Sequence, residues 1–250
     1  MPQVKRLRVF AGPNGSGKTT VFRQVAQSYR TGPFVNADEI QRALRIDGAV
    51  SLSSLGVSLR NREWEDWLSE SRWVAQLRHQ GRLGNIRRSG NSLCCTRGKT
   101  GSYDAAIISA FVRTALLARG KTFSLETVMS HPSKIAFITQ AAALGYRTYL
   151  YFICTENPAI NVARVKQRVL LGEHDVPEEK VRSRYTRSLR LLSQAISSSY
   201  RSFLFDNSGK EYSLLLEFKE GSEMTVHREL VPDWALKGAV APLFPEILDD

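Results

Sequence analysis

The segment GPNGSGKT, from Gly12 to Thr19, constrains the fold of this chain more than any other feature of its sequence. It fits the phosphate-loop pattern G-x-x-x-x-G-K-[ST] without a mismatch, and it lies between a strand-like segment, Leu7 to Ala11, and an amphipathic helical pattern over Val21 to Tyr29. The glycines let successive N–H groups point at phosphate oxygens, and the following helix adds the positive end of its dipole. A strand, this loop and a helix in succession therefore predict a site for a nucleoside triphosphate.

ATP with Mg²⁺ is the expected ligand of this loop. Lys18 can reach the β- and γ-phosphates, and the Thr19 hydroxyl can ligate Mg²⁺. We expect Lys18 to sit on an exposed loop and to contribute little to the core. The residues predicted here to bind the nucleotide are Gly12, Pro13, Asn14, Gly15, Ser16, Gly17, Lys18, Thr19 and Thr20.

Strand-like and helix-like segments alternate along the chain, which favours an α/β fold with a mainly parallel sheet covered on both faces. In such sheets, ligands bind beyond the carboxyl ends of the strands. Further strands are expected at 34–36, 122–128, 148–154 and 202–206, and helices at about 38–44, 62–77, 103–118, 134–144, 158–171 and 177–199.

We expect one domain over residues 1–208, with a C-terminal hairpin and tail over 209–250 packed on it. The segment 81–102 interrupts the alternation, because it holds five glycines, five Lys or Arg residues and no acid. This composition indicates a flexible basic loop or insertion. A solvated loop is the simpler interpretation, and contact with a polyanion is the alternative.

The net charge of +11 calls for a polyanionic partner, which could be nucleic acid or the anionic substrates of an enzyme. No recognised nucleic-acid motif appears, which makes a nucleic-acid partner the weaker prediction. No stretch approaches 18 consecutive apolar residues, so the sequence predicts no membrane-spanning helix. The start of the chain has no signal-peptide core, and its three cysteines form no disulfide framework or zinc spacing, so we expect a cytoplasmic protein.

Two acidic residues follow strand-like segments. Asp38 comes just after the second strand and could orient an acceptor hydroxyl and accept its proton, although it could also be a helix cap. Glu126, followed by Thr127, ends the third strand. A carboxylate there could bind Mg²⁺ through water or hold the acceptor, and a structural ion pair with an arginine is the alternative.

A run of cations crosses two late helices and the turn between them. Arg164 and Arg168 are four residues apart and share a helix face, and Arg184 belongs to the second helix. Such cations can stabilise the charge of a phosphoryl group in transfer, and a lid that carries them can exclude water. The alternative for each of them is a solvated helix face.

These segments together resemble the zeta toxins, a family of P-loop kinases, over most of residues 7–208. The phosphate loop alone is generic, whereas its combination with the later segments is specific. The matching segments are AGPNGSGKTT (11–20), NADEI (36–40), FSLETVMSHPSK (123–134), LGYRTYLYFICTENPAINVARVKQRV (144–169), GEHDVPEEKVRSRYTRSL (172–189) and FDNS (205–208).

The resemblance implies a P-loop kinase core of three layers with a helical lid. It implies Asp38 as the base, Lys18 as a phosphate ligand, Arg168 as a lid arginine on the phosphates, and Glu126 in the acceptor site. A second lid cation is expected between His174 and Arg187. The best-studied family members phosphorylate a sugar hydroxyl of UDP-N-acetylglucosamine and are held in check by a small antitoxin, so the resemblance implies a UDP-sugar and such an antitoxin as partners.

The acceptor pocket is expected to include Asp38, Glu126, Thr127, Ser130 and Lys134. Lys134 could offer a cation to an anionic acceptor, or it could open a helix that faces solvent. The chain also departs from the members that act on UDP-sugars. Those have an acidic residue where this chain reads ISAF (108–111), and a Gly-Thr-Gly turn with an arginine where it reads TVMS (127–130).

Three functional hypotheses follow. The leading one is a zeta-toxin-like ATP-dependent kinase of a small-molecule hydroxyl, in which the departures leave the acceptor and toxicity open. The second is a detoxifying or metabolic phosphotransferase. The third is a nucleotide-regulated nucleic-acid-binding module, whose binding should depend steeply on salt.

Overall fold

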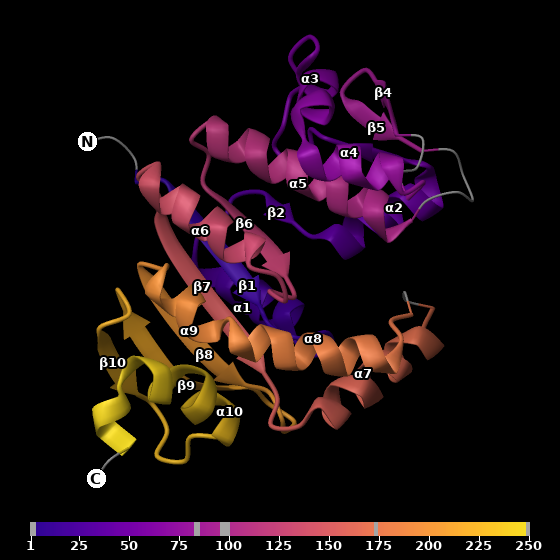
Figure 1. The fold of residues 1–250 in the computed structure, drawn as a ribbon. Helices are drawn as coiled ribbons and strands as arrows, with labels where there is room; N and C mark the ends of the chain where they lie inside the picture. The colour runs from indigo at the N-terminus through magenta and orange to yellow at the C-terminus, as the bar shows by residue number, and fades with distance from the viewer. Residues whose placement is uncertain (1–3, 83–85, 96–100, 173–174, 249–250) are drawn as a thin grey trace. The chain divides into compact units, whose positions relative to one another are not determined.

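A computed structural model of the 250-residue chain describes residues 4–82, 86–95, 101–172 and 175–248 (Figure 1). The chain divides into two compact units. The first contains Met1–Thr31 and Glu126–Asp250, and the second contains Gly32–Leu125.

The sheet of the first unit has the strand order β10-β9-β8-β7-β1. The strands β1 (Arg6–Ala11), β7 (Arg147–Cys154) and β8 (Arg201–Asp206) run parallel, whereas β9 (Ser213–Lys219) and β10 (Glu223–Val226) form an antiparallel hairpin beside β8. The sequence of β7, RTYLYFIC, is nearly all aromatic or aliphatic, and its last five residues are buried. Such a continuous apolar run is typical of a parallel strand that is covered on both faces.

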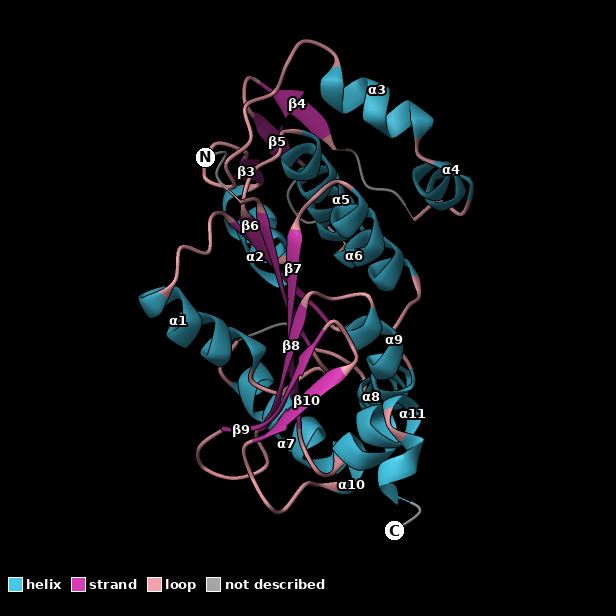
Figure 2. Ribbon diagram, turned by 90° about the vertical axis from the view of Figure 1, so that its left-hand side faces the viewer, coloured by secondary structure: helices cyan, strands magenta, loops and turns pink. Residues whose placement is uncertain are grey.

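Helices lie on both sides of these strands. In Figure 2, α1 (Lys18–Ser28) lies on one side of β7, and α6 (Ser133–Ala143) and α9 (Leu192–Ser197) lie on the other. The helices α7 (Pro158–Leu170) and α8 (Glu178–Arg190) pack against each other through a cluster that includes Val162 and Val181. The prediction of an α/β fold with a mainly parallel sheet, helical layers and a C-terminal hairpin is therefore confirmed.

The tail after the hairpin forms short helical turns, which the sequence did not predict. They are α10 (Asp233–Ala235), a π-helical turn (Leu236–Val240), α11 (Ala241–Leu243) and a 3-10 turn (Pro245–Leu248). Trp234 in α10 is buried, and its Nε1 donates a hydrogen bond to Asp206 Oδ1 at 3.3 Å. The tail thus packs against the end of β8.

The second unit is built around the long helix α5 (Ser102–Ala118). In it, β2 (Phe34–Val35) pairs in parallel with β6 (Phe123–Thr127), and α2 (Ala37–Asp47) packs against α5. A separate small antiparallel sheet has the order β3-β5-β4, from β3 (Ala49–Ser51), β4 (Arg87–Ser89) and β5 (Ser92–Cys94).

The segment 81–102 differs from the expected loop, because its described part contains the hairpin β4–β5. Asn91 anchors this hairpin: its Nδ2 donates to Val57 O at 3.0 Å, and its Oδ1 accepts from Leu59 N at 2.7 Å. Leu93 of β5 is fully buried. These side chains hold the hairpin in place, although the glycines and charges of the segment alone suggest disorder. Residues 83–85 and 96–100 lie outside the described part.

The helix expected over 62–77 is instead two helices, α3 (Glu63–Glu70) and α4 (Arg72–His79). Ser71 separates them, because its extended backbone ends α3 and its hydroxyl accepts a hydrogen bond from Val74 N at 3.4 Å as the N-cap of α4. A serine inside an apolar helical pattern was the signal for this break.

Trp64 should contribute more to stability than any exposed aromatic residue of the same unit. It is 1% exposed and packs edge-to-face on Phe111, with 5.1 Å between the ring centroids. We expect Trp64→Ala to lower the free energy of unfolding by about 3–5 kcal/mol, because it leaves a large cavity. Urea denaturation measures this change, with Trp73→Ala, a residue that is 39% exposed, as the matched control. Equal losses in the two variants would contradict the packing described here.

Candidate functional site

The phosphate loop joins β1 to α1 in a tight curve that depends on glycine. Gly12 has a φ of 140°, and a β-carbon there would overlap the carbonyl oxygen of Ile153 in β7. Gly15 has a φ of 74°, and its β-carbon would lie 2.7 Å from Asn161 O. The loop therefore lies directly on its neighbours, and the glycine pattern reflects close backbone approach as well as positive φ.

Two asparagines outside the phosphate loop donate hydrogen bonds to its backbone carbonyl groups. Asn161 Nδ2 donates to Asn14 O at 2.7 Å, and Asn207 Nδ2 donates to Ser16 O at 2.8 Å. Asn161 is fully buried in α7, and Asn207 follows β8. Neither residue has a role that was predicted from the sequence. Their signal was that each follows the end of a parallel strand, in ENPAIN and FDNS.

Lys18 is buried, so the expectation that it sits on an exposed loop is wrong. It is 6% exposed, its Nζ donates to Pro13 O at 2.9 Å, and Nζ lies 3.7 Å from Glu126 Oε1. The ammonium group is thus turned back into the loop, and its partners are a carbonyl and a carboxylate. A buried cation requires partners of this kind, because desolvation of an unpaired charge is costly.

Glu126 lies beside the residues that begin α1. Its Oε2 accepts a hydrogen bond from Thr19 Oγ1 at 2.8 Å, and its side chain is 11% exposed. The arrangement brings the acid at the end of β6 to the predicted phosphate ligand and the predicted metal ligand. Glu126 therefore forms an ion pair with Lys18 of the phosphate loop. The sequence had suggested an arginine as the partner of such an ion pair.

Backbone donors at the start of α1 remain available. Gly17 is the N-cap and has no side-chain cap bond. Within the part of the chain that the structure describes, no acceptor takes the N–H groups of Gly17, Lys18 or Thr19. Unpaired N–H groups at a helix N-terminus form a site for an anion. Thr20 N, by contrast, donates to Gly17 O at 3.1 Å, and the Thr20 side chain is exposed.

The arginines of the α7–α8 pair differ in their contacts. Arg184 Nη1 donates to Asn14 Oδ1 at 3.2 Å. Arg164 Nη1 donates to Asn207 O at 2.7 Å, and thereby supports one of the two asparagines. Arg168 is exposed in the last turn of α7, and His174 lies outside the described residues. Of the predicted lid cations, Arg184 is the one with a direct hydrogen bond to the phosphate loop among the described contacts.

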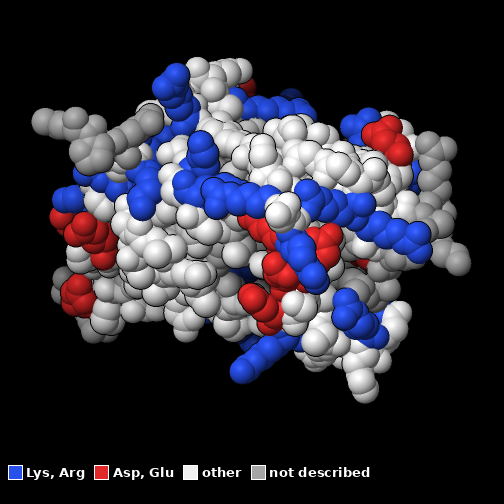
Figure 3. Space-filling view, turned by 90° about the horizontal axis from the view of Figure 1, so that it is seen from above, with Lys and Arg blue, Asp and Glu red and all other residues white. Residues whose placement is uncertain are grey.

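Other cations of these helices are engaged elsewhere. Lys166 Nζ and Arg182 Nη2 each lie 2.9 Å from a carboxylate oxygen of Glu178, and their hydrogen bonds lower the pKa of this exposed acid. Figure 3 shows Lys and Arg side chains spread over one face of the molecule with acidic side chains among them. The excess of positive charge is thus not concentrated in the phosphate site alone.

The segment after Glu126 carries three of the predicted acceptor-binding residues. Thr127 Oγ1 accepts a hydrogen bond from Met129 N at 3.3 Å, Ser130 is half-buried, and Lys134 is half-buried in the first turn of α6. His131 Nδ1 accepts from Ser133 N at 3.2 Å and so supports the start of that helix. The five-residue turn before α6 is therefore locally ordered.

Asp38 belongs to the second unit. It lies exposed in the first turn of α2, whose N-cap is Asn36, because the Asn36 side chain accepts from Asp38 N at 2.9 Å. The alternative in which Asp38 itself caps this helix is therefore wrong. Its role as a base stays a prediction.

Two reactive groups near the loop are held neutral. Burial raises the pKa of the Cys154 thiol, at the end of β7, to about 12. Burial also raises the pKa of Tyr185, whose hydroxyl donates to Thr155 O at 2.7 Å. Neither side chain is available as an anionic nucleophile at neutral pH.

Among the described residues, no group of three or more His, Cys, Asp or Glu side chains is placed to hold a metal ion. No helix in the described ranges is long and apolar enough to cross a membrane.

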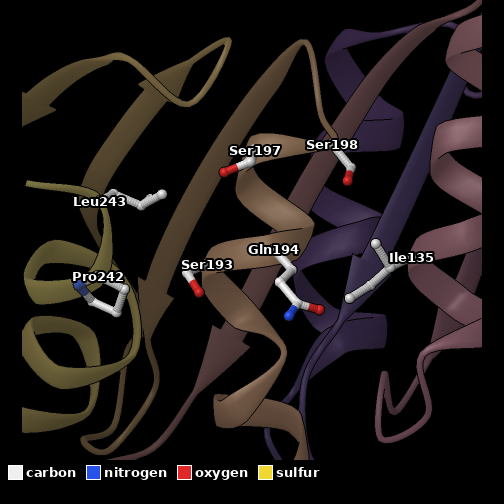
Figure 4. A pocket seen from close by; sticks show the side chains of 7 residues that line it. All are labelled: Ile135, Ser193, Gln194, Ser197, Ser198, Pro242 and Leu243. Atoms are coloured by element: carbon white, nitrogen blue, oxygen red, sulfur yellow. The ribbon is translucent and has the colours of Figure 1, made fainter.

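A hollow of about 490 Å³ lies between α6, α9 and α11, and Ile135, Gln194 and Pro242 are among its lining residues (Figure 4). It contains no residue of the phosphate loop, so it is separate from the site described above.

No family model matches the sequence. No curated protein matches it either. Solved structures do match the fold. A chain of the AvrRxo1-ORF1:AvrRxo1-ORF2 complex crystallised with ATP is 15% identical over 90% of this chain and 61% of that chain, with a TM-score of 0.55. A native crystal of the same complex gives 14% identity over 90% of this chain and 62% of that one, with a TM-score of 0.57.

A looser likeness, with a TM-score of 0.49, joins the chain to the PezAT toxin–antitoxin system of Streptococcus pneumoniae at 14% identity, covering 100% of this chain and 89% of that one. The chain spans about six tenths of the AvrRxo1 chains that it matches, 62% and 61% in two of the crystals. At this identity the likeness to the AvrRxo1 chains establishes a shared fold.

The close approach of Gly12 to β7 can be tested by adding a single methyl group. We expect Gly12→Ala to lower the free energy of unfolding by about 1–3 kcal/mol more than Gly145→Ala does, because only the first β-carbon meets backbone. Gly145 is a matched control, since its φ of 78° is also positive and nothing lies within 4 Å of its added β-carbon. Chemical denaturation of both variants measures the difference, and equal losses would show that φ alone matters.

Proposed function

We propose that this protein is an ATP-dependent kinase that transfers a phosphoryl group to a hydroxyl of a small molecule. In the reaction, the acceptor oxygen forms a bond to the γ-phosphorus, the bond from that phosphorus to the β,γ-bridging oxygen breaks, and ADP leaves. The hydroxyl proton passes to a carboxylate. One observation carries the proposal: Glu126 contacts both Lys18 and Thr19 at the start of α1. Among the described residues, no acceptor takes the N–H groups of Gly17, Lys18 and Thr19 at the same place.

Each feature of this site suits a triphosphate. The N–H groups of Gly17, Lys18 and Thr19 can bind phosphate oxygens, and Lys18 can exchange Pro13 O and Glu126 for the β- and γ-phosphates. Arg184, beside Asn14, is a cation at the rim of the loop. The AvrRxo1-ORF1:AvrRxo1-ORF2 complex, which shares the fold, was crystallised with ATP, and this supports ATP as the donor.

Mg²⁺ fits the Thr19–Glu126 pair. A hydroxyl and a carboxylate oxygen lie 2.8 Å apart there, and Mg²⁺ prefers one or two such protein oxygens together with phosphates and water. We infer that Thr19 ligates the ion and that Glu126 holds a water of its coordination shell. When bound, Mg²⁺ neutralises charge that develops on the phosphates.

For the acceptor we propose a nucleotide sugar of the UDP-N-acetylglucosamine type. The resemblance to the zeta toxins supports it, and so do the polar residues Thr127, Ser130 and Lys134, which follow Glu126. Asp38 is the proposed base, and Arg168 and Arg184 are the proposed lid cations. A small antitoxin is the proposed partner, because AvrRxo1-ORF1 was crystallised in complex with AvrRxo1-ORF2. The cytoplasm is the proposed location.

A detoxifying or metabolic phosphotransferase would use the same site on another hydroxyl. The departures from the UDP-sugar pattern at 108–111 and 127–130 favour this second candidate. The distinction lies in the acceptor and leaves the donor chemistry unchanged.

Asp38→Asn should lower kcat by about a hundredfold or more while the affinity for ATP stays unchanged, because the amide cannot accept the hydroxyl proton. Glu39→Gln is the matched control, since Glu39 is the neighbouring exposed acid in the first turn of α2. Single-turnover kinetics and equilibrium ATP binding provide the two readouts. If Asp38→Asn keeps its turnover, the base lies elsewhere.

The acceptor can be tested with radiolabelled ATP and a panel of UDP-sugars and uncharged sugars. We expect Lys134→Ala to raise the KM of a UDP-sugar by about tenfold and to change that of an uncharged sugar little, since one charged contact is lost. Equal effects on both acceptors would remove Lys134 from the pocket. The kinase proposal itself fails if no small molecule is phosphorylated and the chain instead binds nucleic acid with a steep salt dependence.

A further inference from the structure

Helix α8 contacts three segments that follow the ends of parallel strands. Arg184 Nη1 donates to Asn14 Oδ1 at 3.2 Å, in the loop after β1. The Tyr185 hydroxyl donates to Thr155 O at 2.7 Å, directly after β7. Ser188 Oγ donates to Val128 O at 2.5 Å, directly after β6. In Figure 1, α8 runs across these strand ends.

The β6 contact lies at an unusual turn. Met129 has a φ of 51°, a conformation that residues with a β-carbon rarely adopt, and its side chain is fully buried. Burial and the bond from Met129 N to Thr127 Oγ1 favour the turn, and the Ser188 hydroxyl fixes the carbonyl just before it. Ser188 itself is fully buried, and its hydrogen bond to Val128 O is partly buried.

This turn directly follows Glu126 in the chain. Val128 is two residues after Glu126, so a shift of its carbonyl also turns the backbone that carries the Glu126 carboxylate. That carboxylate accepts from Thr19 Oγ1 at 2.8 Å and lies 3.7 Å from Lys18 Nζ. The separation between the end of β6 and the phosphate loop therefore depends on what holds Val128.

On the basis of the proposed kinase function, we propose that Ser188 is a positioning residue for the metal and phosphate site. It ties the end of β6 to α8, and Arg184, one turn earlier on the same helix face, ties α8 to the phosphate loop. Through these two contacts α8 sets the position of Glu126 opposite Thr19. Without the hydroxyl, the half-buried Val128 carbonyl loses this donor and the turn relaxes.

Ser188→Ala tests this role, with Ser199→Ala as the matched control. Ser199 is also a buried serine, 4% exposed, and its Oγ donates to a backbone carbonyl, Ala195 O, at 2.8 Å. Both variants lose the same group and should melt at a lower temperature than the wild type. Binding of a fluorescent ATP analogue is then titrated with Mg²⁺.

We expect Ser188→Ala alone to need about fivefold more Mg²⁺ for half-maximal binding, the change that corresponds to one lost hydrogen bond. If Ser188→Ala does not fold, Ser188→Cys nearly preserves the volume and weakens the donor, and it should shift the titration in the same direction by a smaller factor. A titration of the Ser188 variant that matches that of Ser199→Ala would overturn the positioning role. Failure of the wild type to bind the analogue at all would instead overturn the proposed function, and this inference with it.

Discussion

The contact of Glu126 with Lys18 and Thr19 is the interaction on which the rest of this site depends. It joins the end of β6 to the start of α1 and places a carboxylate and an ammonium group together where little water reaches them. Two charges in such surroundings stabilise each other only if both are held in place, because the loss of one leaves the other buried and unpaired. The surrounding hydrogen bonds serve this requirement.

The phosphate loop is a rigid, supported structure. Asn161 and Asn207 hold its carbonyl groups, and Gly12 and Gly15 let it lie against β7 and α7 without space for a β-carbon. Side chains on α8 add hydrogen bonds to three of the strand-end segments. Donors that are held in place in this way lower the cost of ordering a site around an anion, and preorganisation of this kind is the general requirement for electrostatic stabilisation of phosphoryl transfer.

The positive charge of the chain has several separate functions in the structure. Arg184 faces the loop, whereas Lys166 and Arg182 pair with Glu178. On β1, Arg8 is buried and lies over the rings of Tyr29 and Tyr149, at 6.0 and 5.5 Å from their centroids. Some of the cations thus have partners within the protein itself, so the net charge of +11 is weak evidence for a nucleic-acid partner.

The sequence by itself determined the phosphate loop, the alternation of strands and helices, and the residue types Lys18, Thr19 and Glu126, because glycine spacing and hydrophobic periodicity are local properties. It missed the hairpin at 87–94 and the burial of Lys18. Only the tertiary structure decided that Thr19 and Glu126 meet, since 107 positions separate them, and that Ser188 reaches the end of β6. Such contacts depend on how the strands pack side by side, and no local pattern encodes which buried polar groups will face each other.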